Sequence, residues 1–180
     1  MKAIIFDFGG VIALHKGLYY VPIFSDVEMW HQAENGEIPE EEFWKRLEAY
    51  YHKNSDEILK MLVSERELNL PLIEFLKEKK KDLKLGFINN GLSRLTEKLV
   101  KDWGLEKLFE VMIISSKEKL SKPDPKIFLL ACERLGVKPE DCVFIGRKES
   151  YVEVAQSLGM KGFVYEDFSS FKSQISQLLD

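Results

Sequence analysis

Clustered cysteines, long apolar runs and a surplus of basic residues are all missing from this sequence, and each absence excludes a class of protein. The only cysteines are Cys132 and Cys142, which lie in apolar segments without zinc-ligand spacing, so we expect buried, reduced thiols. The net charge of −4 provides no basic surface for nucleic acid. No apolar run approaches the length of a membrane span, and the first residues turn acidic too soon for a signal peptide. We therefore expect a cytoplasmic protein with neither a nucleic-acid nor a membrane partner.

The apolar residues that are present predict an α/β fold. With 180 residues, 45% of them hydrophobic, the chain is long enough for one core and a small insertion. Short, continuously apolar runs alternate with helical patterns, which is typical of a doubly wound parallel sheet covered on both faces. The expected strands lie within residues 2–8, 84–90, 110–116, 142–147 and 161–166, and the expected helices within residues 92–104, 124–136 and 149–159. One face of a last helix is expected to consist of Phe168, Phe171, Ile175 and Leu178.

Residues 14–70 interrupt this alternation and predict an inserted helical cap. The segment is rich in aromatic residues at first and then helix-patterned, with breaks at Gly36 and Pro39. It follows the first strand directly, so we expect it to overhang the carboxyl edge of the sheet, where open α/β folds bind their ligands. The α/β core would then consist of residues 1–13 and 71–180.

Two charged residues stand where predicted strands and helices meet. Asp7 ends an apolar run and is followed closely by Gly9 and Gly10. Lys122 precedes a proline, which favours an extended backbone at the lysine, and an N-cap aspartate follows. Both positions fall at junctions where a strand gives way to a helix. Taken alone, each residue also fits a structural role, as a capping carboxylate and as a solvated surface charge.

Four segments form a recognisable set. Residues 6–11 read FDFGGV, residues 85–91 read LGFINNG, residues 121–128 read SKPDPKIF and residues 143–163 read VFIGRKESYVEVAQSLGMKGF. Together they resemble motifs one to four of the haloacid dehalogenase superfamily, in the branch that carries a helical cap between its first two motifs. Residues 35–44, NGEIPEEEFW, are similar to the cap of phosphatase-like members of that branch. The resemblance covers nearly the whole chain and implies a Rossmann-like α/β core.

The resemblance also implies roles for individual residues. Asp7 would be a nucleophile that attacks phosphorus or carbon and forms a covalent aspartyl intermediate, which water then hydrolyses. Lys122 would keep this carboxylate ionised and screen a small anionic substrate. The backbone at Gly9 and Gly10 would approach the substrate closely. The remaining substrate-binding groups would be Asn89, Asn90 and Gly91, together with the helix N-terminus that follows them and with Arg147.

The sequence departs from the family pattern in motif one. Family phosphatases carry a second aspartate two residues after the nucleophile, as general acid and base, and this position is Gly9 here. Losing such a group typically costs about 10²–10⁴ in rate when the leaving group must be protonated. The sequence therefore predicts a site that lacks its usual proton donor.

A second departure concerns magnesium. In motif four, Arg147 and Tyr151 replace the acids that hold Mg²⁺, so only Asp7 and the backbone carbonyl of Gly9 remain as ligands. An arginine about 4 Å from a divalent ion costs roughly 8 kcal/mol at an effective dielectric constant near 20. These residues argue against a bound Mg²⁺, although Glu149 or Glu153 would supply a substitute carboxylate if the loop rearranged. The guanidinium would instead pair with Asp7 or clamp a phosphate or carboxylate.

Two functional hypotheses follow. The first is a hydrolase, of the phosphatase or the dehalogenase type, that uses Asp7 on a small phosphorylated or other anionic substrate, with impaired metal dependence. The second is a degenerate relative that binds a small anion or a protein partner without turnover. The histidines His15, His31 and His52 lie in the insertion without metal-ligand spacing, and we expect core or surface roles for them.

Overall fold

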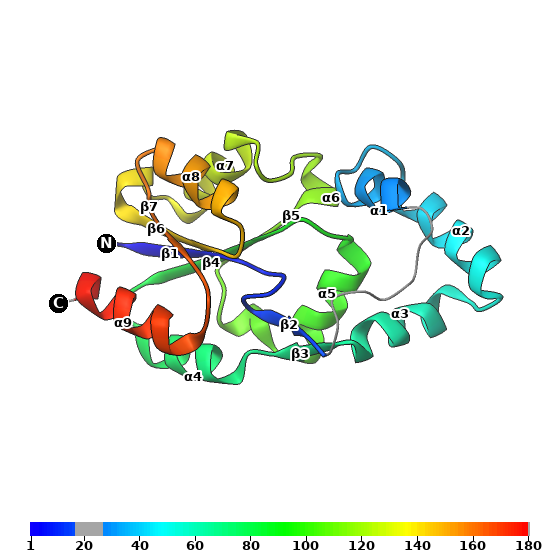
Figure 1. Cartoon of the computed structure of the whole chain (residues 1–180), viewed down its shortest axis with the longest axis horizontal. Coiled ribbons are helices and arrows are strands. Elements are labelled where there is room, and N and C mark those ends of the chain that lie inside the picture. Colours follow the sequence, from blue (N-terminus) through cyan, green and yellow to red (C-terminus); the bar gives the residue numbers. More distant parts are fainter. Residues whose placement is uncertain (17–26, 180) are drawn as a thin grey trace.

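The computed structural model describes residues 1–16 and 27–179. Its centre is a five-stranded sheet in the order β5-β4-β1-β6-β7, in which neighbouring strands are parallel (Figure 1). The strands are β1 (Ala3–Asp7), β4 (Lys84–Asn89), β5 (Val111–Ile114), β6 (Cys142–Gly146) and β7 (Lys161–Val164). Each lies inside an apolar run that predicted a strand, so the prediction of a doubly wound parallel sheet is confirmed.

Helices cover both faces of the sheet because alternate side chains of each strand point in opposite directions. On one face, Ala3 and Ile5 share a hydrophobic cluster with residues of α7 (Pro125–Leu135) and α8 (Glu149–Ser157). On the other face, Ile4 and Phe6 share a larger cluster with α4 (Leu70–Lys79), α5 (Ser93–Asp102) and α9 (Phe168–Leu179). The shorter helical segments are η1 (Leu105–Lys107), α6 (Ser115–Glu118) and η2 (Pro139–Asp141).

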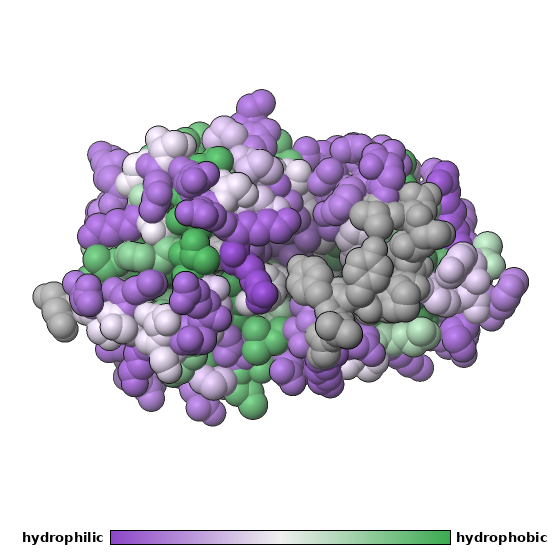
Figure 2. All heavy atoms as spheres, viewed as in Figure 1, coloured by the Kyte–Doolittle hydropathy of each residue, from purple (hydrophilic) through white to green (hydrophobic). Residues whose placement is uncertain are grey.

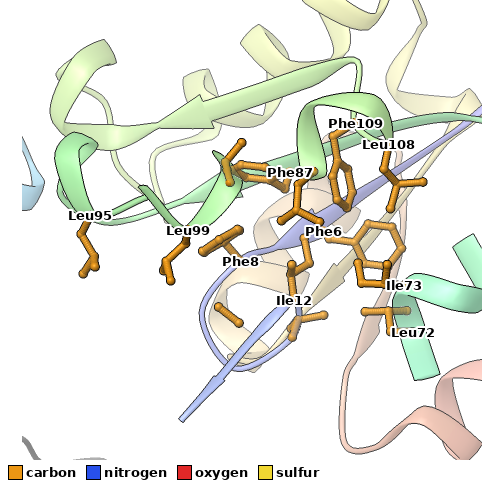
Figure 3. Close-up of a cluster of buried hydrophobic side chains, with 14 of the residues drawn as sticks. Phe6, Phe8, Ile12, Leu72, Ile73, Phe87, Leu95, Leu99, Leu108 and Phe109 are labelled. Carbon is orange, nitrogen blue, oxygen red and sulfur yellow. The ribbon is translucent and has the colours of Figure 1, made fainter. Parts of the chain in front are cut away.

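Phenylalanine side chains occupy the centre of the larger cluster (Figure 3). The ring of Phe6 lies 6.3 Å from that of Phe109 and 5.9 Å from that of Phe171, both in edge-on geometry, and Phe87 lies 5.4 Å from Phe109. Because Phe171 belongs to α9, the predicted last helix packs on the sheet as expected. Its predicted apolar face, Phe168, Phe171, Ile175 and Leu178, joins this cluster.

Three helices form a lobe beyond the carboxyl ends of the strands (Figure 1). They are α1 (Val27–Glu34), α2 (Glu40–Tyr51) and α3 (Ser55–Ser64), and we call them the helical lobe. The antiparallel strands β2 (Ala13–His15) and β3 (Arg66–Leu68) pair at its base. Buried residues of the lobe, such as Phe43 and Ile58, belong to the same cluster as Phe6, so the lobe and the core share one interior.

The two cysteines are buried free thiols, as expected, with their sulfur atoms 3.5 Å apart. The face of the molecule shown in Figure 2 is mostly hydrophilic, with apolar surface in separate small areas. Within the part of the chain that the structure describes, the helices are too short or too polar to cross a bilayer.

A buried asparagine joins three parts of the core. Asn69 is 4% exposed and caps α4, where its Oδ1 accepts a hydrogen bond from the backbone N–H of Leu72. Its Nδ2 donates to the carbonyl oxygen of Val11 at 2.8 Å and to the hydroxyl of Tyr165 at 2.7 Å. These bonds fix α4 against the turn after β1 and the segment after β7.

We expect Asn69→Ala to lower the free energy of unfolding by about 2–4 kcal/mol, because it removes a helix cap and leaves buried polar groups without partners. The matched control is Asn54→Ala, which removes an exposed N-cap from α3 and should cost only about 1 kcal/mol. Equilibrium urea unfolding measures both values. Equal losses in the two variants would contradict a joining role for Asn69.

Candidate active site

Asp7 stands at the carboxyl end of β1, where the chain turns sharply. The backbone N–H groups of Ile12 and Ala13 both donate to the carbonyl oxygen of Phe8, and the N–H of Gly10 donates to the carbonyl oxygen of Ala13. Gly10 has φ +76°, a conformation that favours glycine. This turn leaves the Asp7 side chain 9% exposed at the edge of the sheet.

Lys122 forms a buried ion pair with Asp7. Its Nζ lies 2.6 Å from Asp7 Oδ1 and 2.6 Å from the carbonyl oxygen of Ile88, and its side chain is fully buried. Burial lowers the pKa of Lys122, and the negative charges of Asp7 and Glu34 oppose this shift. The edge of the sheet therefore brings together two residues that lie far apart in the sequence.

The segment after β4 holds the lysine in place. Asn90 Oδ1 accepts from the backbone N–H of Lys122 at 2.9 Å, and Asn90 Nδ2 donates to the carbonyl oxygen of Lys122 at 2.8 Å. Asn89 Nδ2 donates to Thr96 Oγ1 at 2.7 Å, and the N–H of Gly91 donates to Ser115 Oγ at 2.9 Å. Thus Asn89, Asn90 and Gly91 all line the site, but these donors are already used within the protein.

The N-terminus of α5 is occupied by a carboxylate of the helical lobe. Glu40 of α2 accepts hydrogen bonds from the backbone N–H groups of Ser93 and Arg94, at 2.7 and 3.0 Å, and from the Ser93 hydroxyl at 2.7 Å. The expectation that this helix N-terminus offers donors to a bound anion is therefore wrong, because those N–H groups already donate to the Glu40 carboxylate.

The motif-four residues place positive charge at the rim of the site. The side chain of Arg147 lies against the backbone of Gly10, since a Cβ at Gly10 would stand 2.7 Å from Arg147 Cδ. Arg147 is exposed, and within residues 1–16 and 27–179 no ion pair joins it to Asp7. The Tyr151 ring lies 5.2 Å from the Nζ atoms of both Lys122 and Lys148. Burial raises the pKa of the Tyr151 phenol, and the charge of Lys148 opposes this.

A cavity of about 410 Å³ opens above these residues, between the sheet edge and the helical lobe. Apolar side chains, including Leu62, Leu95 and Leu99, form part of its wall. Its charged lining residues are Asp7, Glu34, Arg66, Lys122, Arg147 and Lys148. A Cβ at Gly9 would meet no atom within 4 Å, so position 9 has room for a side chain.

The sequence predicts a core or surface role for His31 and no role for Glu34, but both residues line the cavity from α1. Glu34 accepts hydrogen bonds from Trp30 Nε1 and His31 Nδ1, both at 2.8 Å, and the three residues line the cavity together. No motif marks them, and the only available signal is the three-residue spacing of His31 and Glu34, which places them on one helix face.

Several known proteins resemble this chain in sequence. A model of haloacid dehalogenase-like hydrolases matches residues 1–146. The phosphorylated carbohydrates phosphatase of Thermotoga maritima is 33% identical over 181 residues, which cover 89% of this chain and 83% of that protein. The glyceraldehyde 3-phosphate phosphatase of Methanopyrus kandleri is 40% identical over 79 residues, which cover 43% of this chain and 34% of that protein.

Solved structures share the fold at lower identity. A haloacid dehalogenase family enzyme from Bacteroides thetaiotaomicron, in complex with magnesium and inorganic phosphate, superposes with a TM-score of 0.80 at 22% identity and covers 95% of this chain and 98% of its own. A phosphatase of the same family from Thermococcus onnurineus has a TM-score of 0.67 at 24% identity and covers 92% of this chain and 86% of its own.

His15, which lines the cavity, makes the stability of the folded protein depend on pH. It lies opposite Arg66 in the register of β2 and β3. Burial, together with the positive charges of Arg66 and Arg147, lowers the pKa of His15 to about 4. Below the unfolded pKa of about 6.5, the unfolded chain therefore binds a proton that the folded chain does not. Stability should fall as the pH falls from about 6.5 to about 4.

Because His15 is partly exposed, we expect this loss to be about 1–2 kcal/mol. Urea unfolding at pH 7 and pH 4 should show a smaller loss in His15→Gln than in the wild type by that amount. Identical pH dependence in the two proteins would show that His15 is not held neutral by the fold.

Proposed function

This chain belongs to the haloacid dehalogenase-like hydrolase family, and we propose that it hydrolyses small phosphate monoesters through an aspartyl-phosphate formed on Asp7. The observation that carries the proposal is the Asp7–Lys122 pair at the base of a cavity. Lys122 holds Asp7 Oδ1, and no donor in the described part of the chain binds Oδ2, so one carboxylate oxygen is left to attack.

The reaction proceeds in two displacements. Asp7 Oδ2 attacks phosphorus, the ester P–O bond breaks, and the alcohol leaves. Water then attacks the aspartyl-phosphate and releases inorganic phosphate together with the free carboxylate. Lys122 stabilises the anionic phosphoryl group beside Asp7, and the cations at the rim, Arg147 and Lys148, attract the dianionic substrate.

The relatives indicate the substrate class. Both curated relatives described above are named as phosphatases of phosphorylated carbohydrates or of a triose phosphate. A cavity of about 410 Å³ with a partly apolar wall has the size for a small phosphorylated sugar. We further propose that residues 14–70 act as the cap that covers this substrate.

The residues present do not fit a magnesium site. Mg²⁺ prefers carboxylate and water oxygens in octahedral geometry. Asp7 has one oxygen that Lys122 does not bind, but the motif-four positions supply Arg147, Lys148 and Tyr151 rather than further acids. Within the described residues, no group of three or more histidine, cysteine, aspartate or glutamate side chains stands close enough to hold a metal ion. We therefore propose that Arg147 supplies the positive charge at this edge of the site.

A second candidate function is binding of a small anion without turnover. The observation that favours it is Gly9, which leaves the family's acid position without a proton donor although space for one exists. Both functions use the same cavity, and only the presence of Asp7-dependent turnover separates them.

Asp7→Asn should lower turnover of phosphorylated sugars by about 10³-fold or more, because it removes the nucleophile. Phosphate release is measured on a panel of phosphate monoesters, with magnesium and with a chelator. Wild-type activity should persist in chelator. Asp7→Glu tests for loss of folding, since it keeps the charge beside Lys122 but displaces the nucleophile, and Asp141→Asn is the remote control.

The two candidate functions give opposite results in this assay. Turnover that Asp7→Asn and Asp7→Glu both abolish, and that Asp141→Asn retains, supports the hydrolase. If the wild type releases no phosphate above the background of Asp7→Asn, the hydrolase proposal is wrong and the binding function stands.

If the charge of Arg147 excludes magnesium, Arg147→Asp should create a magnesium site beside Asp7. Titration calorimetry of the protein with MgCl₂ alone should then show binding in Arg147→Asp and none in the wild type. Arg147→Met is the matched control, because it removes the charge without adding a ligand. Calorimetric traces of Arg147→Asp that match the wild type would contradict this account.

A further inference from the structure

We infer that His31 of the helical lobe, oriented by Glu34, donates the proton to the leaving alcohol that position 9 does not supply. This inference rests on the proposed phosphatase function and names the missing acid of that site. It assigns a catalytic role to a residue outside the four motifs.

Among the described residues, few groups of the cavity lining can carry a transferable proton. Lys122 is buried and donates to Asp7. The Tyr151 phenol has a raised pKa and is therefore a weaker acid than usual. His15 lies beside Arg66 and Arg147, which, with burial, lower its pKa to about 4, so that it is neutral at pH 7. His31 is the remaining histidine of the cavity wall.

Glu34 fixes the orientation of His31. A carboxylate oxygen only accepts, so the hydrogen bond of 2.8 Å between Glu34 Oε1 and His31 Nδ1 makes Nδ1 the donor. The other carboxylate oxygen accepts from Trp30 Nε1 at 2.8 Å, and the Trp30 ring packs edge-on against Phe43 at 5.5 Å. With Nδ1 engaged, Nε2 is the ring atom left to exchange a proton.

Backbone contacts tie this pair to the nucleophile. The carbonyl oxygen of Glu34 accepts from Ser115 Oγ, and the same hydroxyl accepts from the N–H of Gly91 at 2.9 Å. Gly91 follows Asn90, which clamps the backbone of Lys122. The charge of Glu34 acts on the pKa of both Lys122 and Tyr151, so the carboxylate faces the same cluster as Asp7. His31 and Asp7 therefore both line the same cavity.

His31 both gives the proton in the first step and accepts one in the second. As Asp7 displaces the alcohol, the ester P–O bond breaks and the leaving oxygen takes the Nε2 proton of the His31 imidazolium. Neutral His31 then accepts a proton from the water that attacks the aspartyl-phosphate. This second displacement releases inorganic phosphate, frees Asp7 and restores the imidazolium.

Leaving-group dependence tests this role. A sugar phosphate leaves as an alkoxide that needs a proton, whereas p-nitrophenolate leaves without one. For His31→Gln we expect kcat/KM on the sugar phosphate to fall about 10²–10³-fold, and on p-nitrophenyl phosphate to fall about 3-fold or less. Glu34→Gln should give the same pattern at smaller size, because the amide still binds Trp30 or His31 but carries no charge.

Two further variants complete the design. His52→Gln is the matched control, because His52 is an exposed histidine at the C-terminus of α2 and outside the cavity lining; it should behave as the wild type. Gly9→Asp combined with His31→Gln should recover the sugar phosphate reaction at least tenfold, because a carboxylate at this open position supplies a new proton donor.

Each outcome decides the inference. A selective loss on the sugar phosphate, with recovery by Gly9→Asp, supports it. Equal losses on both substrates, or no loss on either, overturn it while Asp7-dependent turnover keeps the proposed function standing. Absence of any Asp7-dependent turnover in the wild type overturns both.

Discussion

The buried ion pair between Asp7 and Lys122 is the interaction on which the rest of the site depends. Taking a carboxylate and an ammonium out of water costs several kcal/mol for each ion, and only close pairing with further hydrogen bonds offsets this. Lys122 meets the condition through Asp7 and the carbonyl oxygen of Ile88, while Asn90 clamps its backbone from both sides. The pair therefore forms only when β1, β4 and the segment before α7 are assembled together.

Once this pair is in place, the remaining charges favour an anionic ligand over a cationic one. Lys122 already neutralises Asp7, and His31 with Trp30 occupies both oxygens of Glu34. Arg147 and Lys148 then add positive charge at the cavity rim without an acidic residue in their motif positions. A dianionic phosphate ester suits this balance, whereas a divalent cation would face repulsion from both rim residues.

The sequence carries enough information to predict the fold and the approach of Asp7 to Lys122. The strands are continuously apolar because both sheet faces are covered, and the carboxyl ends of parallel strands meet at one edge, which places Asp7 near Lys122. The partners of individual donors were not predictable. The sequence indicates no partner for the backbone N–H groups of Gly91 and of the N-terminus of α5. In the structure these groups donate to Ser115 and Glu40, which lie elsewhere in the chain. These contacts depend on tertiary geometry, which local patterns do not encode.

The helical lobe is the part whose placement matters most for the proposed chemistry, because it holds His31 and Glu34. The lobe contacts the core at the N-terminus of α5 through both polar and apolar groups. Glu40 caps that helix, and the guanidinium of Arg94 lies 5.0 Å from the Trp44 ring. Since the lobe also shares the interior cluster of the core, a swing of the lobe would break the cap and expose apolar surface together. The positions of His31 and Asp7 are therefore held by the same contacts that stabilise the fold, which is what the proposed roles of a proton donor on the lobe and a nucleophile on the sheet require.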